Sequence, residues 1–314
     1  MDSELIPDLY PSRRGAQPDW LERHDPVVQG LPGRAPPIDQ AMIDGFVRDG
    51  FAVLEDVFSA EEVRGLVAEA RALRKQSGLL PETCISERGE TGVDAVRSVF
   101  APHQQSKAFA RLAADGRLSG LARYILGDEV YIHQSRINYK PAFRGKDFYW
   151  HSDFETWHTE DGMPRMRALS MSVMLTDNHP QSGPTMFMPG SHKSFVTCVG
   201  ETPEDHYRQS LKKQDYGIPD TDSLAKLAGQ GGIAAPAPKA GSVVIFDCNT
   251  MHGSNSNITP LERINAFLVF NAWSNRLVDP FGRTRPRPEF IAHRQVKSPI
   301  QPLSAQAPLS AGGR

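Results

Sequence analysis

The pattern of apolar residues changes near Val130, and this change constrains the fold more than any other feature of the sequence. From there on, short segments of alternating apolar and polar residues follow one another, separated by Gly, Pro, Asn and Asp. Alternation with a period of two is typical of strands that bury one face. A series of short strands after a helical first third predicts a β-sandwich or barrel with helices packed outside. The expected strands lie within 129–140, 146–154, 166–176, 184–189, 241–247 and 262–273, with a charged helical insertion over 203–229.

The residues before this change are predicted to be mostly helical. Ser59 and Glu62 form a capping-box pattern, which predicts a helix that begins there and continues to about Gln76. The other expected elements are a helix over 39–49 that buries Ile43, Phe46 and Val47 and ends at Gly50, a strand over 51–58, a polar loop over 77–95, and one or two helices over 105–126 that end at Gly127.

The two ends of the chain differ from the part between them. Residues 1–38 are rich in Pro, Arg and Gly without periodicity, which predicts an irregular lead-in. Residues 295–314 end in a low-complexity stretch and are expected to be a disordered tail. We therefore predict one domain over 39–294, with a helical part over 39–128 and a β core over 129–294.

Composition excludes several classes of protein. Lys plus Arg is 35 and Asp plus Glu is 37, so the net charge is −2 and the basic excess of a nucleic-acid binder is missing. No apolar run approaches the roughly 18 residues of a membrane helix. The three cysteines are too few and too widely spaced for a disulfide framework. These features predict a protein of the reducing cytoplasm.

The segment FYWHSDFETWHTEDGMPR (148–165) holds the densest group of aromatic, histidine and carboxylate side chains. His151 and Asp153 are two residues apart, so on a strand both would point to the same side and could share a cation. His158 and Glu160 form a second pair of this kind with the opposite parity. A lone His-x-Asp pair is equally compatible with a polar edge strand, so this segment alone does not identify a metal site.

Two later segments strengthen the case for a metal site. His252 follows a buried apolar strand, at the rim of a sheet where sites are often built. Arg263 begins an otherwise apolar strand, and its guanidinium can bind a carboxylate with two hydrogen bonds. Two histidines and one carboxylate are the facial triad of non-haem Fe(II) oxygenases. A zinc hydrolase with the same ligand types remains an alternative.

The order of these motifs resembles the phytanoyl-CoA dioxygenase superfamily. It runs from the His-x-Asp pair through PGSH (189–192) and GSVVIFD (241–247) to His252 and then to Arg263, eleven residues further on. The resemblance implies Fe(II), 2-oxoglutarate and O2 acting on a double-stranded β-helix, or jelly-roll, core. It narrows to the ectoine hydroxylases of this superfamily over about residues 8–294. The segments that carry it are 148–172, 131–140, 246–255, 8–13 and 198–207.

Roles for individual residues follow from the resemblance. It implies that His151, Asp153 and His252 bind iron and are the catalytic centre, and that Lys140 and Arg263 bind 2-oxoglutarate. The residues implied to line the ectoine site are Gln134, Thr156, Trp157, Ser172, Phe270 and Arg287. On pattern alone, Trp157 and Phe270 are equally explained as core residues, and Arg287 as a solvated charge.

The resemblance also implies a reaction and an assembly. Ectoine, 2-oxoglutarate and O2 would give 5-hydroxyectoine, succinate and CO2, in the synthesis of a compatible solute that protects against stress, and the enzyme would be a homodimer. The alternatives are a related hydroxylase of another small zwitterion such as proline, a zinc hydrolase with two His and one Asp, and a jelly roll that binds a solute without catalysis.

Overall fold

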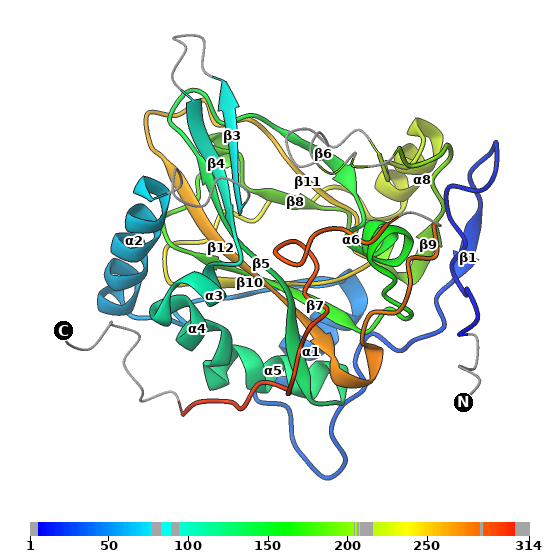
Figure 1. Ribbon diagram of the computed structural model, residues 1–314, viewed down its shortest axis with the longest axis horizontal. Coiled ribbons are helices and arrows are strands. Elements are labelled where there is room, and N and C mark those ends of the chain that lie inside the picture. The colour runs from blue at the N-terminus through cyan, green and yellow to red at the C-terminus, as the bar shows by residue number, and fades with distance from the viewer. Residues whose placement is uncertain are drawn as a thin grey trace.

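The computed structural model describes residues 6–76, 83–88, 94–203, 205, 207, 216–282 and 285–304. Its centre is a seven-stranded antiparallel sheet with the order β2-β10-β7-β12-β5-β4-β3 (Figure 1). A three-stranded sheet, β6-β11-β8, and the pair β1-β9 complete the strands of the described part of the chain. A mainly β protein with helices packed outside is therefore confirmed.

The strands are β1 (Trp20–Glu22), β2 (Phe51–Leu54), β3 (Cys84–Arg88), β4 (Asp94–Phe100), β5 (Val130–Lys140), β6 (Phe148–His151), β7 (Ala168–Met174), β8 (Thr185–Phe187), β9 (Ser194–Val196), β10 (Val243–Asp247), β11 (His252–Ser254) and β12 (Arg263–Ala272). The α-helices are α1 (Gln40–Asp49), α2 (Ala60–Lys75), α3 (Pro102–Gln105), α4 (Lys107–Ala114), α5 (Gly116–Leu126), α6 (Asp153–Thr156) and α8 (Thr221–Gly231). Short helices of other kinds are η3 (Trp157–Asp161), which is a π-helix, and the 3-10 helices η4 (Pro180–Ser182), η5 (Ser191–Lys193) and η6 (Trp273–Asn275).

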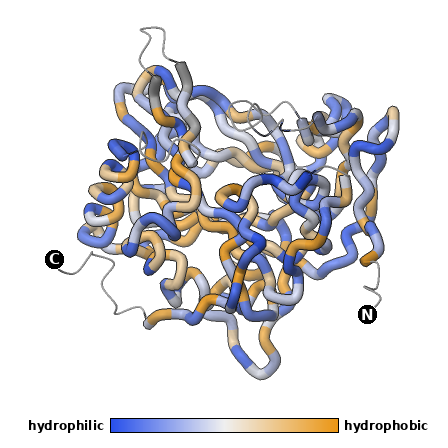
Figure 2. The backbone as a smooth tube through the Cα atoms, viewed as in Figure 1, coloured by the Kyte–Doolittle hydropathy of each residue, from blue (hydrophilic) through white to orange (hydrophobic). Residues whose placement is uncertain are grey.

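The two faces of the large sheet have different partners. One face packs against helices α1, α2, α4 and α5 and forms the main apolar core, to which Ile137, Ala266 and Val173 contribute from three neighbouring strands. The opposite face is lined by more polar residues and meets the small sheet. In Figure 2 apolar residues concentrate along the central strands and on the inner turns of the helices, whereas the outer loops are mostly hydrophilic. The interior between the two sheets is therefore polar in part, beside an apolar cluster of Met174, Phe187, Val244, Phe246 and Phe267.

The helical first third agrees with local sequence signals. Helix α2 begins with the predicted capping box, in which Ser59 and Glu62 each bond the backbone of the other. Helices α1 and α5 end at Gly50 and Gly127, both in the left-handed conformation that glycine adopts without strain. Val47 is 40% exposed, so its predicted place on the buried face of α1 is wrong.

Several segments differ from the prediction. The expected polar loop over 77–95 contains β3 and the start of β4, while 77–82 and 89–93 lie outside the described residues. The expected irregular lead-in contains β1, which pairs with β9. In the expected disordered tail, residues 295–304 are described and Leu303 bridges to Asp115, while 305–314 lie outside the described residues. Edge strands of three to five residues gain their stability from a distant partner, so their own sequence carries a weak signal.

The helical insertion over 203–229 is confirmed where it is described, since α8 covers its second half; residues 204, 206 and 208–215 lie outside the described residues. None of the helices within the described ranges is long and apolar enough to span a bilayer.

Candidate metal centre

The small sheet brings two histidines together. His151 is the last residue of β6 and His252 is the first residue of β11, and the antiparallel register places them directly opposite each other. Their ring centroids are 4.3 Å apart. Asp153 follows the end of β6 and opens helix α6. One ligand atom from each of these three residues lies within 4.8 Å of the other two, so the group predicted from the sequence is assembled.

Asp153 reaches this group by a different route from the predicted one. Alternation along a strand would have placed it beside His151, but β6 ends at His151 and the chain turns into α6. Its Oδ1 lies 3.7 Å from His151 Nε2, and its Oδ2 lies 3.8 Å from His252 Nε2. Ser170 of β7 donates a hydrogen bond of 3.3 Å to Oδ2 and orients the carboxylate. The first turn of α6, and not the alternation of a strand, therefore places Asp153 beside the two histidines.

Backbone carbonyls set the tautomer of both histidines. His151 Nδ1 bonds Tyr149 O at 2.8 Å, and His252 Nδ1 bonds Thr250 O at 2.9 Å. Because a carbonyl only accepts, each Nδ1 carries a proton, and in the neutral ring the lone pair is then on Nε2. Burial and the neighbouring His252 lower the pKa of His151 to about 3, so its ring is neutral near pH 7. Two such Nε2 atoms facing a carboxylate fit a divalent transition metal.

The competing pair, His158 and Glu160, is already engaged in other contacts. His158 Nε2 lies 2.9 Å from Asp8 Oδ1, and His158 Nδ1 donates to Met163 O at 2.8 Å. Both ring nitrogens therefore have protein partners. Glu160 accepts from the buried Arg13 at 2.7 Å. Of the two candidate pairs, only the first has free ligand atoms facing one point.

The polar face of the large sheet faces the metal group, and strands β5, β12 and β7 contribute its residues. Register partners across an antiparallel sheet point to the same side. Gln134, Val269 and Ser170 form one row across β5, β12 and β7, and Arg136, Phe267 and Ser172 form the next. Because Ser170 contacts Asp153, both rows face the metal group.

Two cations lie opposite each other further along this face. Lys140 at the end of β5 is the register partner of Arg263 at the start of β12, and both are buried. Lys140 donates to Ser254 Oγ at 2.8 Å. Arg263 donates to Gly183 O, but its Nε has no partner and no described carboxylate lies within ion-pair distance. Like charges opposite each other are destabilising unless an anion lies between them.

The electrostatics of Arg263 support this interpretation. Its side chain is the largest among the fully buried ones of the described residues. Burial, with the nearby cations Arg136 and Arg97, lowers the pKa of Arg263 to about 9. A guanidinium in such surroundings favours a bound carboxylate strongly, because the anion supplies both the missing charge and the missing acceptor.

Arg136 is a residue that the sequence analysis missed. Its guanidinium lies over the ring of Phe267, 4.9 Å from the centroid, and its Nε is buried without a hydrogen-bond partner. Burial lowers its pKa as well. The signal was available, because Gln134, Arg136, Asn138 and Lys140 alternate along one predicted strand and must share a face.

Most of the expected substrate residues also surround this interior. Ser172 Oγ and Thr156 Oγ1 are buried and have no partner among the described atoms. Trp157 is buried beside Thr156 at the start of the π-helix η3, and its ring packs on His133. Gln134 donates to Ile291 O, in the segment after β12 that crosses in front of β7 and α6 in Figure 1. Buried polar atoms without partners mark places where a polar ligand or water binds.

Phe270 does not line this interior. A register shift between Val269 and Phe270 interrupts the pairing of β12 with β5, and Phe270 packs in the main core beneath the helices. This packing does not test a contact with a bound molecule, so the substrate contact at Phe270 stays a prediction. Phe267, three residues earlier, faces the polar interior in its place.

Arg287 is buried and paired with a carboxylate, so it is not the solvated charge that its pattern alone indicates. It binds Asp161 through two hydrogen bonds of 2.8 and 2.6 Å, and Glu160 lies 3.7 Å away. Its charge is therefore compensated within the protein, unlike that of Arg136 or Arg263. Asp161 also lies 3.3 Å from His133, whose ring contacts Trp157. Arg287 thus supports the wall of the site through Asp161, and its contact with the substrate stays a prediction.

The amino-acid sequence of the chain is similar to those of known proteins. Residues 46–265 match the family described as Phytanoyl-CoA dioxygenase (PhyH). An ectoine dioxygenase from Sphingopyxis alaskensis is 58% identical over 288 residues, which are 91% of this chain and 93% of that protein.

Solved structures agree with the sequence comparison. A crystal structure of EctD from S. alaskensis with 2-oxoglutarate and 5-hydroxyectoine matches with a TM-score of 0.86 and 51% identity, over 96% of this chain and all of that one. A structure of the same protein with bound Fe gives a TM-score of 0.85 and 50% identity over the same shares.

The metal group can be tested directly. Replacing His252 with Ala should weaken the binding of Co(II) to the metal-free protein by more than about 100-fold, because one of three ligand atoms is lost. Replacing His158 with Gln should leave the affinity unchanged, because both nitrogens of that ring already have partners. Visible absorption during a Co(II) titration measures both. Equal losses in the two variants would contradict the assignment.

Proposed function

The chain belongs to the phytanoyl-CoA dioxygenase family and, within it, to the ectoine dioxygenases, and from this premise we propose how its own residues carry out the family's reaction. The protein is an iron- and 2-oxoglutarate-dependent dioxygenase that hydroxylates ectoine to 5-hydroxyectoine. In this proposal His151, Asp153 and His252 hold the iron, with Ser170 orienting the carboxylate.

The observation that carries the proposal is the pair of buried cations beside the metal group. A 2-oxoglutarate molecule has two carboxylates, one of which can join the metal while the other lies at a distance. Arg263 has an unused Nε donor and no described anionic partner, and it lies opposite Lys140. These two residues match the distal carboxylate in charge and in hydrogen-bonding groups.

The metal and its cosubstrate supply the oxidative chemistry when they are bound, and the protein contributes binding, orientation and shielding. The ring orientations of His151 and His252 are fixed by carbonyl groups, so neither ring has to turn when iron binds. Asp153 adds one negative charge. This prepared arrangement avoids reorganisation at the moment of binding.

The remaining polar groups suit a small zwitterionic ring. Ectoine carries a delocalised amidinium and a carboxylate. The face of Trp157 can accept the cationic ring, and Thr156 and Ser172 offer buried hydroxyl groups without partners. The carboxylate has a compensating cation in Arg136, which shares a row with Ser172 across the intervening Phe267 and has no described ion-pair partner. Such fixed contacts select one C–H bond for reaction.

We also propose an oligomeric state and a cellular location for the protein. A homodimer is supported by the resemblance and by exposed apolar side chains on two adjoining loops, Phe143 on one and Ile258 and Leu261 on the other. Light scattering should give twice the mass of one chain, and a single-chain mass would contradict the dimer.

A cytoplasmic location is supported by three free cysteines, of which Cys198 and Cys248 are buried, as in proteins of reducing compartments.

Product analysis tests the function. The purified protein with Fe(II), 2-oxoglutarate and O2 should convert ectoine to 5-hydroxyectoine and form one succinate for each product molecule. Proline in place of ectoine should give little product, and removal of O2 should abolish turnover. Mass spectrometry of both products measures this. Turnover that continues without O2 would contradict the oxygenase assignment and favour hydrolysis.

A change at Arg263 tests the cosubstrate site. Arg263→Gln should raise the KM for 2-oxoglutarate by about 100-fold, because loss of a buried charged partner costs roughly 3 kcal/mol and 1.4 kcal/mol corresponds to tenfold. Arg263→Lys keeps the charge without the two-pronged geometry and should give an intermediate KM. The KM for ectoine should change far less. A larger change for ectoine than for 2-oxoglutarate would contradict the assignment.

A further inference from the structure

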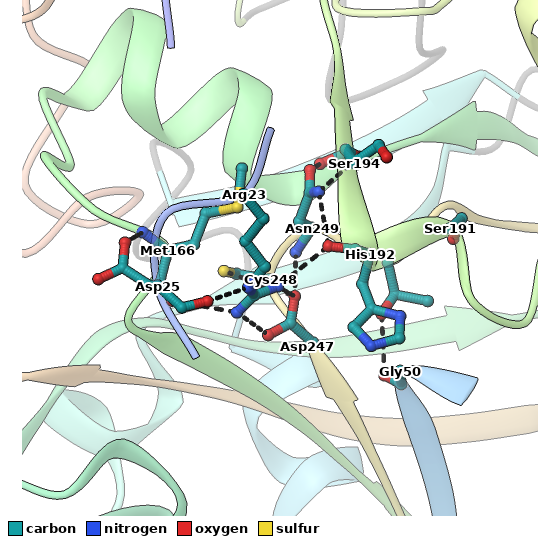
Figure 3. A network of polar contacts seen from close by, with 12 residues as sticks. Arg23, Asp25, Gly50, Met166, Ser191, His192, Ser194, Asp247, Cys248 and Asn249 are labelled. Atoms are coloured by element: carbon teal, nitrogen blue, oxygen red, sulfur yellow. Dashed lines mark hydrogen bonds and ion pairs between the residues drawn. The ribbon is translucent and has the colours of Figure 1, made fainter. Parts of the chain in front are cut away.

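The side chain of Arg23, in the N-terminal segment, is buried. Arg23 directly follows β1, and its side chain is only 5% exposed. Its two terminal nitrogens bind both oxygens of Asp247 at 2.8 Å, a geometry visible in Figure 3. The three other donors go to carbonyl groups of Asp25, His192 and Met166. All five N–H groups of this guanidinium are therefore used, which fixes its position fully.

Asp247 connects Arg23 to the loop 248–251, which leads from β10 to the metal group. It is the last residue of β10, and its Oδ1 also accepts the backbone N–H of Asn249 at 2.9 Å. The Asn249 side chain donates to the carbonyl groups of His192 and Ser194. Residues 248–251 form no helix or strand, so these side-chain bonds replace a regular ladder. The next residue after this stretch is the metal-group residue His252.

The same loop holds Asp153 from both sides. Ser152 donates its hydroxyl to Asn249 Oδ1 at 3.0 Å, and the N–H of Phe154 donates to Cys248 O at 2.8 Å. The two residues that flank Asp153 are therefore tied to the loop that ends at His252. The distance between carboxylate and imidazole consequently depends on the position of this loop, and that position depends on Asp247.

Charge makes this restraint strong. Asp247 is only 4% exposed, so its carboxylate would be left buried and uncompensated without Arg23. Removing one partner of a buried ion pair is more disruptive than removing a surface charge. A displaced Asp247 would release Asn249, and with it the bond to Ser152. Neither Arg23 nor Asp247 belongs to the metal group itself.

We propose that Arg23, Asp247, Asn249 and Ser152 form a positioning network that sets the geometry of the metal ligands, so that Arg23 of the N-terminal segment controls the metal affinity. This inference rests on the proposed function, because it concerns the same metal. The four residues of the network are positioning residues, because none of them belongs to the three-residue metal group. Groups that orient metal ligands from behind typically change affinity about 10–100-fold when lost.

The experiment measures Co(II) binding to the metal-free protein, with both the dissociation constant and the visible absorption spectrum as readouts. Arg23→Gln should raise the dissociation constant about 10–100-fold and change the spectrum, because the ligands meet at altered distances. Ser152→Ala removes one hydrogen bond and keeps the buried ion pair, so it should fold and raise the constant about tenfold, the lower end of that range.

Arg117→Gln is the matched control for loss of stability alone. Arg117 also binds a buried carboxylate, Asp115, and a second one, Glu62, but it lies on the helical side of the molecule. Its loss should lower the melting temperature and leave Co(II) binding and the spectrum unchanged. Affinities and spectra like those of the wild type in both Arg23→Gln and Ser152→Ala would overturn the network.

Two other outcomes are also decisive. If Arg23→Gln does not fold, Ser152→Ala alone decides, and a dissociation constant within twofold of the wild type overturns the proposal. If the wild type itself binds no Co(II), the proposed function fails together with the network. Metal binding by the wild type with unchanged variants removes the network and leaves the proposed function intact.

Discussion

The antiparallel register between β6 and β11 is the constraint on which the site depends. It places His252 opposite His151, and the chain turn after His151 then brings Asp153 to both rings. A shift of one residue would send one imidazole to the other face of the sheet. The bond from each Nδ1 to a carbonyl two residues earlier adds a second level of order, because it fixes ring orientation and tautomer together.

The large sheet serves two purposes with its two faces. Residues such as Ile264 and Leu268 of β12 join the core beneath the helices, while Arg263 and Asn265, on the other face of the strand, carry buried polar atoms without partners. Each such atom costs roughly 1–3 kcal/mol. A sheet with one apolar face can tolerate this cost because the core on its other side supplies the stability. The unpaired groups are then available to a charged ligand.

The strand and helix pattern of the sequence predicts most of the fold and marks His151, Asp153 and His252 as candidate ligands, while the choice of this group comes from the family resemblance. It fails where position depends on distant contacts. Arg287 has no signal for Asp161, 126 residues away in the chain. The lead-in gave no indication of β1 or of the buried Arg23, because the partner strand and the partner carboxylate both lie more than 170 residues away.

The central claim is that the metal group and the cations Lys140 and Arg263 form one site for iron and 2-oxoglutarate. A crystal structure obtained without O2, with Fe(II) and 2-oxoglutarate added and anomalous diffraction collected at the iron edge, tests it most directly. The account predicts one iron peak between His151, Asp153 and His252, with the distal carboxylate of 2-oxoglutarate on Arg263. An iron peak elsewhere, or that carboxylate bound at Arg287 with the Asp161 pair broken, would contradict it.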